Sequence, residues 1–156
     1  MGIKVNILVC TDGSKQSRKA LEKAAEIAEG RNVNEVAVIH VYNNKPDISL
    51  FYWDEGSSLN KEQMEQFEKL RNADKDKRKN VLLEALKFFE DKGIKARTIF
   101  KEGHPSHTIV SVAKEEGFDM IVVGSRGLGG LNKVLLGSTS SAVVQEAQDC
   151  SVLIVK

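Results

Sequence analysis

Residues 120–140 read Met120-Ile-Val-Val-Gly-Ser-Arg-Gly-Leu-Gly-Gly-Leu-Asn-Lys-Val-Leu-Leu-Gly-Ser-Thr-Ser140, and this stretch decides the fold. It begins with an uninterrupted apolar run, which is typical of a buried strand, and continues through a glycine-rich segment. It ends in hydroxyl residues before a segment, 141–148, that can be helical. Glycines let the backbone approach an anion closely, and the first N–H groups of a helix are unpaired and favour negative charge. The stretch therefore predicts a strand, a loop and a helix start that together can bind phosphate.

Strand and helix patterns alternate along the whole chain. Runs of β-branched and apolar residues predict strands at 3–10, 33–42, 95–101, 118–123 and 152–155. Helical patterns cover 14–29, 60–92 and a segment that opens at Pro105. Such alternation indicates a parallel sheet that is covered on both faces. We predict an α/β fold: an open, twisted, five-stranded parallel sheet of Rossmann-like type, with helices on both faces and strand order 3-2-1-4-5.

Two parts of the long helical stretch 60–92 differ in pattern. Its second half has a clear apolar stripe, whereas its first half is polar apart from Met64, Phe67 and Leu70. The early turns are expected either to project into solvent or to be separate from the packed part. The aromatic cluster of Phe51, Tyr52 and Trp53 falls in a preceding loop and is expected to cover the sheet edge or the helix.

The composition narrows the class of protein. The 156 residues, 41% hydrophobic and 29% charged, predict a single domain over 1–156. The net charge of +1 disfavours a nucleic-acid partner, because binding a phosphate backbone requires a clustered basic excess. No apolar run approaches the roughly 20 residues that span a bilayer, and no secretory signal is visible. We therefore expect a cytoplasmic protein without a membrane partner, with Cys10 and Cys150 as packed thiols.

Ligands of open α/β sheets bind beyond the carboxyl ends of the strands. Three segments are expected to converge there: 10–14, 41–43 and 124–140. Asp12 lies in the first of them, between Thr11 and Gly13. Its carboxylate can bind a sugar hydroxyl or help to hold a phosphate-bound metal, and it can also serve only as a turn or helix-cap residue.

The glycine spacing of the last segment differs from two common phosphate motifs. Two residues separate Gly124 from Gly127, and nine more precede Gly137. No Gly-Lys-Ser/Thr follows, so the segment is not a P-loop. It also lacks the Gly-x-Gly-x-x-Gly array of dinucleotide-binding folds. The sequence presents no catalytic triad, and His40 is expected to be a packed, hydrogen-bonded histidine.

Three motifs together resemble the universal stress protein family, and the likeness extends over the whole chain. They are Ile7-Leu-Val-Cys-Thr-Asp-Gly-Ser14, Gly103-His-Pro105, and the Gly-x2-Gly-x9-Gly-Ser spacing that ends at Ser138. The spacing is similar to the ATP-binding signature of that family. The resemblance implies ATP as the ligand, with ADP or AMP as further candidates and Mg²⁺ or Mn²⁺ bound through the phosphates.

The resemblance also implies which residues form the site. Those expected beside the nucleoside are Cys10, Thr11, Asp12, Val41, Val123 and Gly124. Those expected at the phosphates are Arg126, Gly127, Gly137, Ser138, Thr139 and Ser140. Within this set Asp12 would contact the metal, and Val41 would meet the adenine edge through its main chain. Cys10 departs from the proline that often occupies its position in the family.

The function implied by the resemblance is regulation in a stress response. ATP would order the loop, a protein partner would read the ordered surface, and hydrolysis would be at most weak. Two alternatives stay open: an interaction module of the same fold that holds no nucleotide, and an adenylating or ATP-hydrolysing enzyme. Adenylating enzymes carry Ser-Gly-Gly-x-Asp-Ser after the first strand, where this chain has Thr11-Asp-Gly-Ser14. The apolar strand 152–155 is expected at a sheet edge, where pairing with a second copy would form a homodimer.

Overall fold

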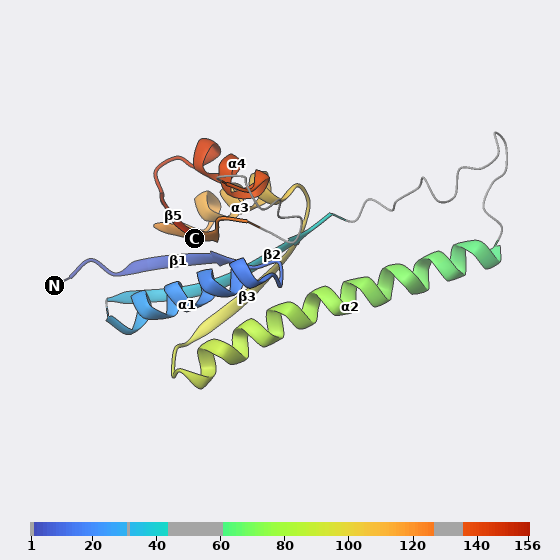
Figure 1. Cartoon of the computed structure of the whole chain (residues 1–156), viewed down its shortest axis with the longest axis horizontal. Coiled ribbons are helices and arrows are strands. Elements are labelled where there is room, and N and C mark those ends of the chain that lie inside the picture. Colours follow the sequence, from blue (N-terminus) through green and yellow to red (C-terminus); the bar gives the residue numbers. More distant parts are fainter. Residues whose placement is uncertain (1, 31, 44–60, 127–135) are drawn as a thin grey trace.

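The computed structural model describes residues 2–30, 32–43, 61–126 and 136–156 (Figure 1). Its elements, in chain order, are β1 (Val5–Cys10), α1 (Lys15–Gly30), β2 (Val33–Tyr42), α2 (Lys61–Asp91), β3 (Ala96–Glu102), α3 (Pro105–Glu115), β4 (Met120–Gly124), α4 (Ser138–Glu146) and β5 (Ser151–Val155). The five strands form one sheet in the order β3-β2-β1-β4-β5, and every neighbouring pair is parallel. The predicted sheet and strand order are confirmed.

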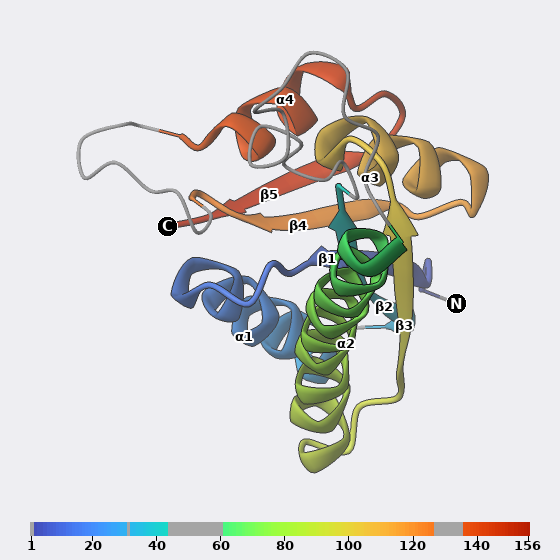
Figure 2. The same ribbon diagram turned by 90° about the vertical axis from the view of Figure 1, so that its right-hand side faces the viewer.

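The helices form two layers around the sheet. Figures 1 and 2 show α1 and α2 on one face and α3 and α4 on the other. One hydrophobic cluster joins Ile7 and Val9 of β1 to α1 and α2. A second cluster, on the other face of the sheet, joins Leu8 of β1 to α3 and α4. Because both faces of β1 are covered, its sequence is a continuous apolar run rather than an alternating one. The carboxyl end of this central strand leads into the candidate site.

The inner face of α1 follows from its sequence period. Ala20, Leu21, Ala24 and Ala25 recur at helical spacing and are buried against the sheet. The helix starts after Ser14, whose Oγ accepts a hydrogen bond of 3.1 Å from the N–H of Ser17. This is the expected chemistry of an N-terminal cap. The first turn of α1 is therefore fixed directly behind the β1–α1 turn.

The long helix α2 is continuous from Lys61 to Asp91. Its second half buries Leu82, Ala85 and Phe89 against the sheet, as the apolar stripe predicts. Residues 61–80 are exposed except for the partly buried Phe67 and Arg78, and they extend past the sheet (Figure 1). The early turns thus belong to the same helix and project from the packed part. Phe51, Tyr52 and Trp53 lie outside the described residues.

Several element boundaries differ from the predicted ones by one to three residues, and those of α4, β1 and β5 are examples. α4 spans Ser138–Glu146 instead of 141–148, because Gly137 accepts the first helical hydrogen bond, 3.0 Å from the Ser141 N–H. β1 starts at Val5, since Ile3 is 88% exposed and has no strand partner, and β5 starts one residue early at Ser151. None of the described helices has the length and apolar character that a membrane crossing requires.

Candidate functional site

The β1–α1 turn is held by its own side chains. Asp12 Oδ1 accepts a hydrogen bond of 2.9 Å from the N–H of Ser14, and Thr11 Oγ1 accepts one of 3.3 Å from Gly13. Gly13 has a φ of +82°, a conformation that glycine adopts without strain. Asp12 therefore fills the turn role that its sequence context suggested.

Val41 lies just beyond the end of the β1–β2 ladder. The register of that ladder ends at Cys10 and Ile39, with one further bond of 3.0 Å from the Thr11 N–H to the Ile39 carbonyl. Val41 follows two positions later and is half-buried. Main-chain groups alternate in direction along a strand, so those of Val41 face the same side as those of Ile39, toward the β1–α1 turn. The structure thus places Val41 next to the Asp12 turn, as predicted.

Gly124 brings the end of β4 against the first turn of α1. Val123 and Gly124 are buried, and a Cβ built on Gly124 would lie 2.7 Å from the Gln16 carbonyl oxygen. Only glycine allows this approach, because the contact is with main chain rather than with a movable side chain. The close contact places Val123 and Gly124 beside the β1–α1 turn.

The two ends of the glycine-spaced segment are hydrogen-bonded to each other. The Gly137 N–H donates to the Ser125 carbonyl at 2.6 Å. The hydroxyl of Ser140, which is 2% exposed, lies 3.1 Å from that same carbonyl and 3.1 Å from the Gly137 carbonyl. A Cβ on Gly137 would come within 3.3 Å of the Arg126 Cα. Arg126 and the start of α4 are therefore neighbours, whereas Gly127 lies outside the described residues.

The start of α4 has the features of an anion site. Its N-cap residue, Gly137, makes no side-chain capping bond, and the first turn contains no acidic residue. Ser138 is exposed and Thr139 is half-buried, so solvent or a ligand can reach this turn. Unpaired N–H groups and the helix dipole attract negative charge, and the neighbouring Arg126 adds a full positive charge. These residues suit a phosphate group.

A metal ion would find few protein ligands here. In the described ranges, no three His, Cys, Asp or Glu side chains are grouped so that they could hold a metal ion. Asp12 alone among the predicted site residues carries a carboxylate. A divalent ion at this site would have to take its other ligands from phosphate oxygens and water, which is how Mg²⁺ is commonly held beside nucleotides.

Two buried titratable residues adjoin the turn, and neither is poised as a nucleophile or base. Burial and the nearby charge of Asp12 raise the pKa of the Cys10 thiol to about 12. His40 is 4% exposed, and its Nδ1 lies 2.8 Å from the Thr11 carbonyl. Burial lowers the pKa of His40 below its usual value, so the ring is neutral at pH 7. His40 is thus the packed, hydrogen-bonded histidine that the sequence predicts, and both Cys10 and Cys150 are free thiols, as expected.

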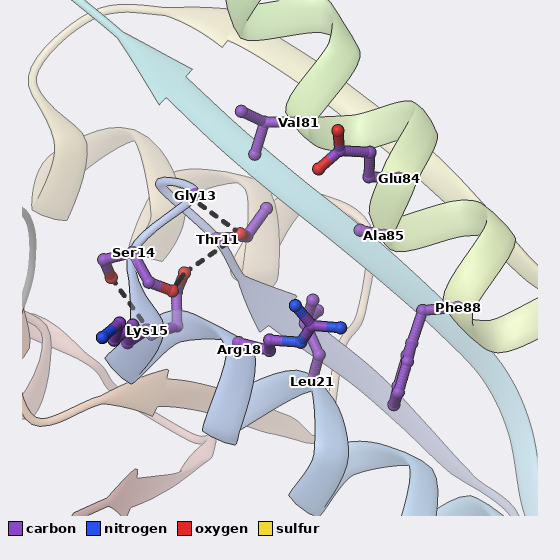
Figure 3. A pocket seen from close by; sticks show the side chains of 11 residues that line it. Thr11, Gly13, Ser14, Lys15, Arg18, Leu21, Val81, Glu84, Ala85 and Phe88 are labelled. Atoms are coloured by element: carbon purple, nitrogen blue, oxygen red, sulfur yellow. Dashed lines mark hydrogen bonds between the residues drawn. The ribbon is translucent and has the colours of Figure 1, made fainter.

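A groove of about 180 Å³ lies behind the same turn, between α1 and α2 (Figure 3). Leu21, Val81, Ala85 and Phe88 give it apolar walls, and Arg18 and Glu84 approach it from opposite helices. Of the eleven predicted site residues that the structure describes, only Thr11 lines it. The groove is on the α1–α2 face, whereas α4 covers the opposite face. The groove therefore shares the β1–α1 turn with the site at the strand ends but lies on the other face of the sheet from α4. Sequence spacing alone could not predict that Arg18 and Phe88 line one groove.

Comparison with known proteins identifies relatives along nearly the full chain. The model of the universal stress protein family matches residues 5–156. Universal stress protein YxiE of Bacillus subtilis is 35% identical over 155 residues, which cover 96% of this chain and 97% of the relative. Universal stress protein MJ0577 of Methanocaldococcus jannaschii is 36% identical over 156 residues, with 96% and 93% coverage.

Solved structures have the same fold. The structure of MJ0577 superposes with a TM-score of 0.78 at 29% identity, over 99% of this chain and 97% of that one. A universal stress protein of Archaeoglobus fulgidus, solved in complex with dAMP, superposes with a TM-score of 0.64 at 22% identity, over 99% and 100% of the two chains. The fold, the motifs and the full-length family match agree: this chain belongs to the universal stress protein family.

Proposed function

We propose that this protein binds ATP at the carboxyl edge of its sheet and acts as a nucleotide-dependent regulator in a stress response. The observation that carries the proposal is the start of α4. It has no side-chain cap, it lies beside Arg126, and hydrogen bonds fix it to the end of β4. Such a helix start can bind a phosphate chain without rearrangement of the sheet.

The residues around this helix start divide between the two halves of a nucleotide. Gly137, Ser138, Thr139 and Ser140 would bind phosphates, together with Arg126 and Gly127. The β1 end with Cys10, Thr11 and Asp12, the main chain of Val41, and the β4 end with Val123 and Gly124 would enclose the nucleoside. The relative solved with dAMP is an example of this fold holding an adenine nucleotide. For this chain the proposal rests on its own residues at the strand ends.

Regulation fits the chemistry of the site better than turnover does. Cys10 holds its proton, and the neutral ring of His40 is buried behind the turn. Asp12 is the one carboxylate in the predicted set, and one of its oxygens already serves the turn. ATP is therefore proposed as a ligand with Mg²⁺ or Mn²⁺ on its phosphates, and hydrolysis as weak. Binding would shift the population of the loop toward one ordered surface that a protein partner reads.

The proposal includes one domain over 1–156, a homodimer formed through β5, and a cytoplasmic location. β5 lies at the edge of the sheet, with one side of its backbone unpaired within the described chain. An unpaired edge can pair with another strand, and a two-fold axis would let two β5 strands pair with each other.

Calorimetric titration with ATP, ADP and AMP, each with Mg²⁺ and with EDTA, tests the binding proposal directly. Binding of ATP in the presence of Mg²⁺ is expected, and absence of any heat with all three nucleotides would contradict it. Hydrolysis is tested separately by phosphate release from saturated protein.

Asp12→Asn tests the metal role more sharply than Asp12→Ala does. The amide oxygen of Asn can still accept the hydrogen bond from the Ser14 N–H, so the turn is kept while the charge is removed. The affinity for Mg²⁺–ATP is expected to fall roughly tenfold, and that for ATP in EDTA to change little. Asp91→Asn, on the exposed end of α2, is the control for a lost charge. Equal losses in Mg²⁺ and in EDTA would remove the metal role of Asp12.

A further inference from the structure

The hydrogen bond between His40 and Thr11 replaces a main-chain bond of the sheet. In a regular parallel ladder, the Thr11 N–H donates to Ile39, and the Thr11 carbonyl then accepts from the N–H of Val41. The first bond is present at 3.0 Å. The second is not among the main-chain bonds of the described residues, and the β1–β2 register stops at Cys10 and Ile39. The Thr11 carbonyl instead lies 2.8 Å from His40 Nδ1.

The direction of this bond follows from the acceptor. A carbonyl oxygen can only accept, so Nδ1 carries the hydrogen and donates it. In the neutral ring the other nitrogen, Nε2, then carries the lone pair. Nε2 is buried and has no hydrogen-bond partner among the described residues. A buried acceptor without a partner is unfavourable. The hydrogen bond at Nδ1 and the packing of the ring therefore offset the cost of leaving Nε2 unpaired.

Packing fixes the ring in this position. His40 lies beside Phe100 of β3, with ring centroids 6.1 Å apart and planes inclined by 27°. Tyr42 stacks on Phe100 as well, with ring centroids 4.3 Å apart. A Cβ on Gly13 would be 3.1 Å from Val81 Cγ2, which shows that α2 packs closely over the adjoining turn. The imidazole thus packs beside Phe100 of β3, and α2 packs over the adjoining turn.

We propose that His40 is a positioning residue for adenine: by occupying the Thr11 carbonyl, it ends the β1–β2 ladder one bond early and keeps the Val41 main chain available to the base. The same bond sets the direction of the Thr11–Asp12 peptide, because the peptide unit is planar. One side chain therefore positions both the adenine contact and the start of the Asp12 turn. The inference rests on the proposed binding of ATP, and it concerns only the nucleoside half of the site.

Matched variants separate this role from general stability. Asn places an amide donor where His40 has Nδ1, whereas Leu has nearly the shape of Asn and no donor. His40→Leu is expected to weaken the binding of Mg²⁺–ATP roughly fivefold to tenfold, the equivalent of one net hydrogen bond. His40→Asn is expected to stay within about twofold of the wild type. Inorganic tripolyphosphate, which has no base, is expected to bind equally to all three proteins.

Two results would overturn the inference once the wild type is shown to bind ATP. One is unchanged ATP affinity in His40→Leu. The other is an equal loss for ATP and tripolyphosphate, because that pattern indicates a general structural effect. If the wild type binds neither compound, the proposed function fails and the adenine role of His40 fails with it, whereas a wild type that binds ATP leaves His40→Leu to test the inference alone.

The protonation state of the His40 ring can be measured without nucleotide and without a variant. In ¹⁵N-labelled wild-type protein at pH 7.5, long-range ¹H–¹⁵N correlation spectra distinguish the two neutral forms of a histidine. The inference requires His40 to carry its hydrogen on Nδ1. A ring protonated on Nε2 would overturn it, even if His40→Leu does not fold.

Discussion

Gly124 and His40 are two single residues on which the geometry of the strand ends depends. Gly124 lets β4 pass against the main chain of Gln16, and His40 holds the Thr11 carbonyl. Neither residue belongs to the helix start that would bind phosphate. Each instead positions strand ends that are proposed to enclose the nucleoside, so substitutions there act on the site through the backbone.

Gly124→Ala is expected to destabilise the protein by about 1–3 kcal/mol, because the added methyl group would lie 2.7 Å from the Gln16 oxygen and the backbone must shift. Urea denaturation measures the loss. Gly30→Ala is the matched control, since nothing lies within 4 Å of a Cβ there. It is expected to leave stability unchanged or to raise it slightly. Similar losses in both variants would contradict the close approach of β4 to α1.

The pH dependence of stability reports on His40. Its folded pKa is lowered by burial, whereas the unfolded value is about 6.5. Above pH 6.5 the neutral ring contributes its full stability. As the pH falls from 6.5 to the lower folded pKa, the unfolded chain binds this proton and the folded protein does not, so the free energy of unfolding decreases. The loss is at most about 1.4 kcal/mol per pH unit. His40→Asn is expected to flatten the profile of urea midpoints between pH 7.5 and 5.5, and parallel profiles would count against the assignment.

Among the elements, α2 has an exposed first half and a second half that packs on the sheet. Only its second half packs on the sheet, and within that half adjacent residues differ sharply in exposure: Leu82 is 4% exposed and Leu83 is 59% exposed. The helix thus owes its place in the fold to a narrow stripe near its end.

Leu82→Ala is therefore expected to cost about 2–5 kcal/mol of unfolding free energy, because it removes buried methyl groups and leaves a cavity. Leu83→Ala is expected to change stability by no more than about 0.5 kcal/mol. Thermal unfolding followed by circular dichroism checks the pair. Comparable effects from the two neighbours would mean that the packed stripe of α2 is wrongly placed.

The elements also show how far sequence reasoning reaches. The inner face of α1 and the packed stripe of α2 follow from apolar periodicity, which is a local signal. The sequence predicts a start of α4 that is three residues too late, because Ser138, Thr139 and Ser140 are weak helix formers. The N-cap residue Gly137 is held by a hydrogen bond to distant Ser125, which no local pattern reveals. Continuity of α2 could not be predicted, since an exposed helix needs no apolar period.

The candidate site also has features that the sequence predicts and contacts that only the fold creates. Asp12 and the glycine spacing belong to sequence motifs, and Val41 follows from the family resemblance; their described members lie at the carboxyl ends of the strands. The contact of Gly124 with Gln16 and the bond from His40 to Thr11 join residues far apart in the chain. Such contacts depend on strand register and could not be derived from spacing alone.

For the whole molecule, the edge position of β5 is the feature that bears on assembly. The Ser151 N–H donates to Asp119, and the Val155 carbonyl accepts from Ser125, so the odd-numbered residues of β5 face β4. The main-chain groups of Val152 and Ile154 accordingly point away from the sheet. These are the groups that would pair with a second copy.

Ile154→Pro is expected to give a folded monomer, because it removes an outward N–H and leaves the bonds to β4 in place. Ile154→Ala is the control: it shortens the side chain but keeps the N–H, so the dimer should persist. Light scattering after gel filtration distinguishes the two states. A wild-type monomer, or an Ile154→Pro dimer, would dismiss the edge pairing.

The exposed first part of α2 has a consequence for how the protein moves in water. Residues 61–80 would rise about 30 Å along the helix axis, a length comparable to the diameter of a small domain. A body with such an arm rotates more slowly end over end than about its long axis. Amide relaxation rates in α2 should then differ systematically from those in helices that lie across that axis.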